Sequence, residues 1–395
     1  MQINKPMALM LASFLLAPKG ANRVSKKRSM SSYILRFLLL SIFVIFVLSA
    51  CQSRDSAEYI FENYLYRLSN SLQVDRESLP TLNAINTSSL ERLSSYPVRR
   101  ELQNNIPSIN INLLEFLRLS ECELQRHIGQ RNGGLGRVMG STQQLIYDAK
   151  FIALAEPCLS QLESTSALSK TLTLAYDHKI QYLSASIWNA SFASKEFSYL
   201  FSLGTNPLSL TAAMEQPLQL SNALKIIAQR YERLMEGGFS AESLDDIETY
   251  YQVVESSKRI GELRLSLQAT TRMLQQADNV LSVRINEKPL CRQQQSNAQF
   301  TIVNNVFYKY YIGQVQPYIA GLHQQGTEMF VIIDALVRLQ VSTQGSNQAQ
   351  TKQLNDFWGK VYRDDDSEWQ LFNQQVKAHT LHWQALLKQC GKLPS

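Results

Sequence analysis

The chain has 395 residues and a formal net charge of +6, from 39 basic and 33 acidic residues. Seven of the basic residues and none of the acidic ones lie in residues 1–51, which leaves 32 basic against 33 acidic residues, a net charge of −1, on the rest. Because a nucleic-acid-binding domain needs a basic field on its folded surface, the composition excludes nucleic acid as an expected partner.

Residues 1–50 are typical of an export leader. Arg36 supplies a positive flank, residues 37–48 form an apolar core of twelve residues, and two small residues precede Cys51. A secretory signal has this order of charge, short apolar core and small residues. Even the widest apolar stretch is shorter than the roughly 20 residues that a spanning helix needs. Residues 1–29 are interpreted as the product of a mis-assigned start codon, with translation beginning at Met30.

The sequence Leu48–Cys51 (LSAC) resembles the lipobox of bacterial lipoproteins. The resemblance implies that Cys51 is diacylated on sulfur, that the chain is cut before it, and that the new amino terminus is acylated. Several acyl chains make a stable anchor, since each buried methylene adds about 0.8 kcal/mol. We therefore expect contact with a membrane through acyl chains on Cys51 and a lipidated tether over 51–58. The alternative is an ordinary signal with an incidental cysteine.

Four cysteines remain once Cys51 is assigned to lipid: Cys122, Cys158, Cys291 and Cys390. The bacterial periplasm is oxidising, so two disulfides are expected. Of the three pairings, Cys122–Cys158 and Cys291–Cys390 are favoured because each joins neighbours in the sequence. The chain-entropy model gives roughly 4 and nearly 5 kcal/mol for loops of these lengths. Four buried free thiols are the alternative, and no CxxC spacing favours zinc.

Helical spacing of apolar residues runs through nearly all of the mature chain. It predicts helices over 57–74, 109–130, 141–156, 166–201, 218–235, 240–286, 349–362 and 367–389, and two more within 297–340. Three prolines and many polar residues make 75–108 an irregular connection. No alternating run of useful length predicts a strand. The predicted fold is an all-α, elongated multi-helix bundle, disulfide-braced, after an N-terminal signal peptide; it occupies 59–390, with 202–217 as a candidate internal boundary.

Three positions in this pattern carry particular expectations. The glycine-rich segment 131–140 is predicted to turn an antiparallel helical hairpin whose arms the first disulfide clamps. Pro157 is expected to kink or restart the second arm. The run 240–286 would be about 65–70 Å long as one helix, which favours an elongated bundle or a break near Gly261.

The GGLG sequence in 131–140 is a weak candidate for a phosphate-binding loop. Such loops follow a strand, and a P-loop also needs Lys-Ser/Thr after its last glycine, whereas a helix is predicted before GGLG and Arg137-Val138 follow it. Phosphate binding is therefore disfavoured. Arg131 and Arg137 remain candidate anion-binding residues.

His379 and His382 lie three residues apart and share one face of the last helix. A metal site would need a third convergent ligand. The preceding acidic run, 364–366, is instead expected to cap the final helix, where negative charge suits the N-terminus. The sequence therefore predicts no metal and no other cofactor.

Aromatic residues gather near the C-terminus. Trp358, Trp369 and Trp383 lie in the last 40 residues, and 306–318 adds five more aromatic residues. With neighbouring glutamine and asparagine they could line a groove for a glycan or a peptide, but a filled aromatic core is the stronger interpretation.

The block CELQRHIGQRNGGLGRVMGSTQQLIYD (122–148), followed by Cys158, resembles the signature of an uncharacterised lipoprotein family of gamma-proteobacteria, domain of unknown function 3080. The resemblance extends from Tyr59 through PVRREL (97–102) to Cys390. It implies a Gram-negative envelope and supports the lipobox, but it implies no activity.

The favoured hypothesis is an interaction or assembly-accessory lipoprotein that binds an envelope protein. In bacterial lipoproteins, aspartate after the lipidated cysteine usually retains the protein in the inner membrane. Because Gln52 follows Cys51 here, we expect the protein to be anchored in the outer membrane's inner leaflet, facing the periplasm. The alternative is an envelope enzyme or a glycan- or peptide-binding lipoprotein, with a deep cleft near 131–140 or in the C-terminal aromatic region. No catalytic constellation stands out, so enzymatic activity is the less favoured interpretation. A sensor with redox-active cysteines is a third, weaker hypothesis.

Overall fold

The computed structural model describes residues 54–75, 93–109, 112–120, 122–132, 138–240, 244–343 and 349–392. Residues Arg54–Ser395 form one compact unit, separate from Met1–Ser53. The predicted leader, Cys51 and Arg137 lie outside the described residues, so the predictions made for them stay predictions. Among the described helices, none combines the length and the apolar character that crossing a bilayer requires.

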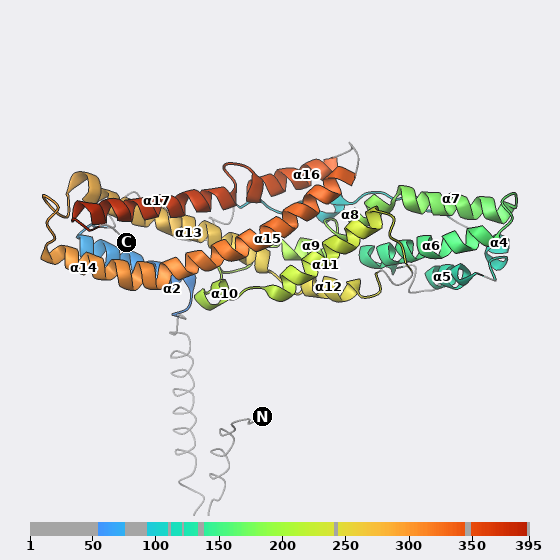
Figure 1. Cartoon of the computed structure of the whole chain (residues 1–395), viewed down its shortest axis with the longest axis horizontal. Coiled ribbons are helices and arrows are strands. Elements are labelled where there is room, and N and C mark those ends of the chain that lie inside the picture. The colour runs from blue at the N-terminus through green and yellow to red at the C-terminus, as the bar shows by residue number, and fades with distance from the viewer. Residues whose placement is uncertain are drawn as a thin grey trace, which may run out of the picture. The chain divides into compact units, whose positions relative to one another are not determined.

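Every regular element in the described part of the chain is a helix (Figure 1). The first half contains α2 (Ala57–Leu72), α3 (Arg99–Leu102), α4 (Leu113–Leu117), α5 (Glu123–Asn132), α6 (Ser141–Gln161), α7 (Ala167–Gln181), α8 (Leu183–Ala190), α9 (Lys195–Leu200) and α10 (Leu210–Met214). The second half contains α11 (Leu218–Met235), α12 (Ile247–Glu255), α13 (Arg259–Ser282), α14 (Ala298–Val306), α15 (Gln316–Thr343), α16 (Ala349–Trp358) and α17 (Glu368–Gln389). Three π-helical segments extend these helices: η3 (Val283–Glu287), η4 (Phe307–Val315) and η5 (Gly359–Arg363).

The predicted single helix over 109–130 is wrong. The helix α4 ends at Leu117, and a turn separates it from α5. The Asn112 side chain starts α4 by accepting a hydrogen bond from the Glu115 backbone N–H at 2.9 Å. The turn before α5 brings Cys122 to Cys158, with 5.7 Å between their Cα atoms. The two arms of the predicted hairpin, α5 and α6, are thus joined by a disulfide.

Two other helix boundaries and one helix cap differ from the sequence prediction. The helix α6 runs through Pro157 to Gln161 without restarting. The stretch 166–201 forms three helices, α7, α8 and α9, rather than one. The last helix is capped by the Ser367 hydroxyl, which accepts from the Gln370 N–H, and not by the acidic run before it.

The long run 240–286 is broken between α12 and α13, next to Gly261. At Gly261 a Cβ atom would overlap the carbonyl oxygen of Ser202. Glycine is therefore required where α13 passes close to the backbone that follows α9. Of the two alternatives that the sequence left open, the structure has the break.

Buried residues form two separate apolar clusters. The main core includes residues of α2, α8, α11, α13, α15 and α17, and Leu208 and Ala213 of the 202–217 segment belong to it. The second core belongs to α5, α6, α7 and the turn before α5. Within the unit, α4–α7 lie at one end and α14 at the other (Figure 1).

Each core is braced by its own disulfide. Cys122–Cys158 ties the second core, and Cys291–Cys390 ties the loop after η3 to the end of α17, with 5.0 Å between the Cα atoms. These are the pairs that sequence proximity favoured. The prediction of an all-α, multi-helix, disulfide-braced fold is confirmed for the described residues.

Candidate functional site

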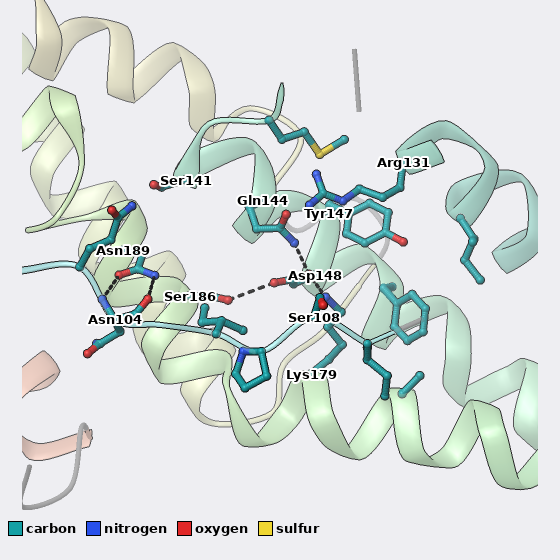
Figure 2. A pocket seen from close by; sticks show the side chains of 18 of the residues that line it. Asn104, Ser108, Arg131, Ser141, Gln144, Tyr147, Asp148, Lys179, Ser186 and Asn189 are labelled. Carbon is teal, nitrogen blue, oxygen red and sulfur yellow. Dashed lines mark hydrogen bonds and ion pairs between the residues drawn. The ribbon is translucent and has the colours of Figure 1, made fainter. Parts of the chain in front are cut away.

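A cleft of about 1020 Å³ lies where α5, α6, α7 and α8 meet the extended segment 103–109 (Figure 2). It is at the upper end of the volumes that small-molecule sites usually have. One part of its lining is apolar, from Ile106, Pro107, Phe116 and Phe151. The other part is polar and comes from several helices. The cleft is therefore amphipathic.

Asp148 on α6 is the centre of the polar part (Figure 2). Its carboxylate accepts hydrogen bonds from the Gln144 amide at 2.7 Å and from the Ser186 hydroxyl at 3.0 Å. The Lys179 ammonium lies 2.6 Å from the same carboxylate. Because Asp148 is buried, these three donors replace the water that its charge would otherwise need. The network joins α6, α7 and α8 at the cleft.

A pair of asparagines holds the extended segment against α8. The Asn104 backbone N–H donates to the Asn189 side-chain oxygen at 2.8 Å, and the Asn189 amide donates to the Asn104 carbonyl at 2.9 Å. Close by, the Trp188 indole N–H donates to the Leu102 carbonyl at 2.6 Å. An amide side chain thus pairs with an extended backbone as a neighbouring strand would, and this fixes one wall of the cleft.

The other side of the polar lining consists of Arg131 and Tyr147, and His127 packs against Tyr147. The Arg131 guanidinium lies 5.6 Å from the centre of the Tyr147 ring, and the His127 ring stacks on Tyr147 at 4.4 Å. Burial lowers the pKa of His127 below its usual value. Burial and the nearby Asp148 carboxylate raise the pKa of Tyr147 to about 12. Both rings are therefore neutral at neutral pH, and Arg131 and Lys179 outweigh Asp148 in formal charge.

The cleft geometry supports binding more than catalysis. Both carboxylate oxygens of Asp148 are engaged, Oδ1 by Gln144 and Lys179 and Oδ2 by Ser186. A general base needs a lone pair within hydrogen-bond reach of the substrate. The arrangement is better suited to hold a ligand that has an apolar part and a polar or anionic group.

Of the two arginines that the sequence suggested for anion binding, the structure describes only one. Arg131 lines the cleft, whereas Arg137 lies outside the described residues. The segment after α5 leads into α6 and has no strand before it, which removes the context of a phosphate loop. Sequence reasoning missed Asp148, Lys179 and Asn189. The only sequence feature that could have indicated them is a polar residue in an apolar stretch of helix, such as Asp148 between Tyr147 and Ala149.

His379 belongs to a closed network in the main core, and the half-buried His382 lies at its edge. The His379 Nδ1 lies 2.5 Å from the Asp278 carboxylate, and the His382 Nδ1 lies 3.3 Å from it. On the other side, the Tyr64 hydroxyl lies 2.9 Å from the His379 Nε2 and accepts a hydrogen bond from the Trp383 indole. His379 is fully buried. No group of three or more metal-binding side chains occurs among the described residues.

The C-terminal aromatic residues separate into two sets. Trp358, Trp369 and Trp383 are buried in the main core. Tyr308, together with Tyr66 of α2, is exposed and lines a second, open groove of about 870 Å³ between α2, α14 and η4. Asn70, Asn305, Arg67 and Lys309 also line this groove. The π-helical backbone of η4 turns its side chains differently from an α-helix, and such segments often occur at functional sites.

Comparison with known proteins identifies a family but no relative of known structure. The family model described as a protein of unknown function (DUF3080) matches residues 61–394, which is more than half of the chain. None of the curated proteins and none of the solved structures matches significantly. The chain therefore belongs to the family of proteins of unknown function called DUF3080.

Proposed function

We propose that this chain is a lipid-anchored protein of the bacterial envelope that binds an amphipathic ligand in the cleft between α5–α8 and the segment 103–109. Acyl chains on Cys51 hold it in the outer membrane's inner leaflet, with the helical body in the periplasm. The LSAC sequence and the short apolar core before it support the anchor. Replacement of Cys51 by serine tests it: acylation and normal processing are lost, and a variant that is still cut and anchored contradicts the proposal.

The observation that carries the binding function is the cleft itself. A deep cleft with converging polar side chains was the feature expected of a binder, and polar groups from four helices and one extended segment meet here. The apolar lining offers favourable burial to hydrocarbon or ring groups. The excess positive charge of Arg131 and Lys179 over Asp148 favours a neutral or anionic polar group on the ligand.

A fluorescent dye with an apolar ring system and a sulfonate, 8-anilinonaphthalene-1-sulfonate, tests the cleft. Ser108 lines the cleft and is exposed, so Ser108→Trp adds a bulky ring to the lining of the cleft with little risk to folding. Asn105 is exposed on the same segment but does not line the cleft, which makes Asn105→Trp the matched control. We expect Ser108→Trp to weaken dye binding about tenfold or more, which corresponds to about 1.4 kcal/mol, and Asn105→Trp to leave it unchanged. Equal binding by both variants contradicts the proposal.

The groove at Tyr66 and Tyr308 favours a second candidate function, the binding of an envelope polysaccharide. Exposed aromatic faces beside amide side chains can stack on sugar rings and bond their hydroxyls. Co-sedimentation with isolated peptidoglycan sacculi tests this function. Tyr308→Ala is expected to reduce binding, whereas Tyr199→Ala, which removes a partly exposed tyrosine elsewhere, is not. Wild-type protein that stays in the supernatant contradicts this candidate.

The partner of an assembly accessory would be another envelope protein. Affinity purification from solubilised envelopes tests for it and predicts one protein in stoichiometric amount. Clean preparations without such a protein, under several growth conditions, count against an accessory role and leave the ligand-binding function as the simpler account.

A further inference from the structure

The chain enters the helical body at α10. The Asp55 backbone carbonyl accepts a hydrogen bond from the Leu210 N–H at 2.8 Å. The Asp55 carboxylate accepts two more from Thr211, from the backbone N–H and from the hydroxyl, each at 3.1 Å. Directly after it, the Ser56 side chain caps α2 by accepting from the Tyr59 N–H. Residue 55 is therefore fixed to the body at two helices, α2 and α10.

Covalent geometry places this entry point close to the proposed lipid anchor. Asp55 follows Cys51 by four residues. Even a fully extended chain spans at most about 3.3–3.6 Å per residue, so the two Cα atoms lie within about 14 Å of each other. If the acyl chains of Cys51 are in a bilayer, α10 must lie at or just above its surface.

The backbone of α10 is held firmly in place. The fully buried side-chain amide nitrogen of Gln325 on α15 shares its two hydrogens among the carbonyls of Ala212, Ala213 and Glu215, at distances of 2.9, 2.6 and 2.9 Å. Arg259 donates to the Ala212 carbonyl as well, at 3.1 Å. On α15, a Cβ atom at Gly321 would overlap the Ala213 carbonyl oxygen, so α10 and α15 are in close contact. A helix of only five residues thus has a fixed orientation on the unit.

This fixed turn presents two large apolar side chains to the outside. Met214 ends α10 and is 57% exposed, and Leu218 begins α11 and is 61% exposed. Met214 lies about one helical turn from Thr211, the residue that holds Asp55. The charges nearby are balanced, since Arg54 and Arg259 are matched by Asp55 and Glu215. The surface is therefore suited to enter an apolar layer rather than to attract an anionic one.

We propose that Met214, Leu218 and the α10–α11 turn form a membrane-contacting surface, which inserts into the lipid bilayer that anchors Cys51. This inference rests on the proposed lipid anchor. The anchor places α10 within reach of the bilayer, and the contacts of Gln325 and Asp55 fix which face of the unit meets it. The partner is a lipid surface, because the short chain between Cys51 and Asp55 keeps α10 next to the bilayer that holds the acyl chains.

Lipid quenching of a fluorescent label tests the surface in the full-length lipoprotein, purified from membranes and bound to phosphatidylethanolamine–phosphatidylglycerol vesicles that contain a spin-labelled lipid. Leu218→Cys carries a nitrobenzoxadiazole label. The control label is on Leu174→Cys, since Leu174 is also a leucine, is 65% exposed, and lies on α7 at the end of the unit away from α10 (Figure 1). We expect spin-labelled lipid to reduce the fluorescence of the label at position 218 at least twofold and to leave position 174 unchanged.

Co-sedimentation with the vesicles separates the two proposals. If the protein co-sediments but the label at 218 is quenched no more than the label at 174, the anchor stands and the membrane-contacting surface is wrong. If the protein does not co-sediment, the anchor is wrong and the inference fails with it. A further variant, Asp55→Ala, removes the acceptor for Thr211 while keeping the anchor. It is expected to co-sediment as before and to lose about half or more of the quenching at 218.

Discussion

The main core and the α4–α7 end of the unit differ in whether their bonded polar side chains are enclosed or line a cleft. In the main core, Asp278, His379 and Tyr64 bond to one another in a buried, closed network. At the α4–α7 end, Asp148 and Lys179 are bonded in the same manner but line an open cleft. The first arrangement stabilises and specifies packing, whereas the second leaves a surface that a ligand can reach. This sequence has no catalytic signature. The position of a polar network that lines a cleft nevertheless indicates where a ligand is expected to bind.

The largest expected effects come from removing the two disulfides, one in each region. The double variant Cys291→Ser/Cys390→Ser opens a long loop of the main core and is expected to lower the free energy of unfolding by nearly 5 kcal/mol, against roughly 4 kcal/mol for Cys122→Ser/Cys158→Ser. Urea denaturation measures both. Only the Cys122/Cys158 variant should also lose dye binding, since only that disulfide braces the cleft. Dye binding lost to the same extent in both variants would show that the two regions are not independent.

The buried ion pair of the main core gives the next largest effect. Arg264 is fully buried and meets the Glu368 carboxylate with two hydrogen bonds of 2.7 Å. Glu368→Ala leaves the guanidinium buried without its counter-charge and is expected to cost about 3–5 kcal/mol. Asp246→Ala, which breaks the exposed pair with Arg230, is the control and is expected to cost about 1 kcal/mol or less. Urea denaturation that shows equal losses would contradict this ranking.

The cleft network is expected to matter less for stability and more for binding. Lys179→Met removes one charged donor from Asp148 and leaves Gln144 and Ser186 in place. We expect a loss of about 1.5–3 kcal/mol in the free energy of unfolding, together with weaker binding of the sulfonate dye. A variant that loses stability but binds the dye as well as the wild type would assign Lys179 a purely structural role.

The smallest effect is a pH dependence located at the cleft end. Because burial lowers the folded-state pKa of His127, the unfolded chain takes up a proton that the folded chain does not. Stability is therefore full above about pH 6.5, the ordinary histidine pKa, and falls as the pH drops below it. Thermal unfolding of wild type and His127→Gln across this range measures the contribution, and the variant should show a flatter profile. Identical profiles would contradict the assignment.

Sequence patterns predicted the helical class and several helices closely, because apolar spacing survives wherever one helix face is buried. The helix predicted over 218–235 is α11, and the one over 367–389 begins within one residue of α17. Breaks inside long apolar runs were harder to predict, because they are caused by contacts between residues far apart in the sequence, such as that of Gly261 with Ser202. The cleft was anticipated only as an alternative near 131–140. Its residues come from five helices, α4 to α8, and from the extended segment 103–109, so no local spacing reveals that Asp148 and Lys179 meet.

Native mass spectrometry of the full-length lipoprotein, extracted gently from the envelope, tests the central claim most directly. A ligand that occupies the cleft during purification adds a defined mass to the wild-type protein. The account predicts that this mass is present in the wild type and in Asn105→Trp and is absent from Ser108→Trp. Wild-type protein that carries no added mass and does not bind the sulfonate dye, or an added mass that Ser108→Trp retains in full, would contradict the claim that the cleft is the binding site.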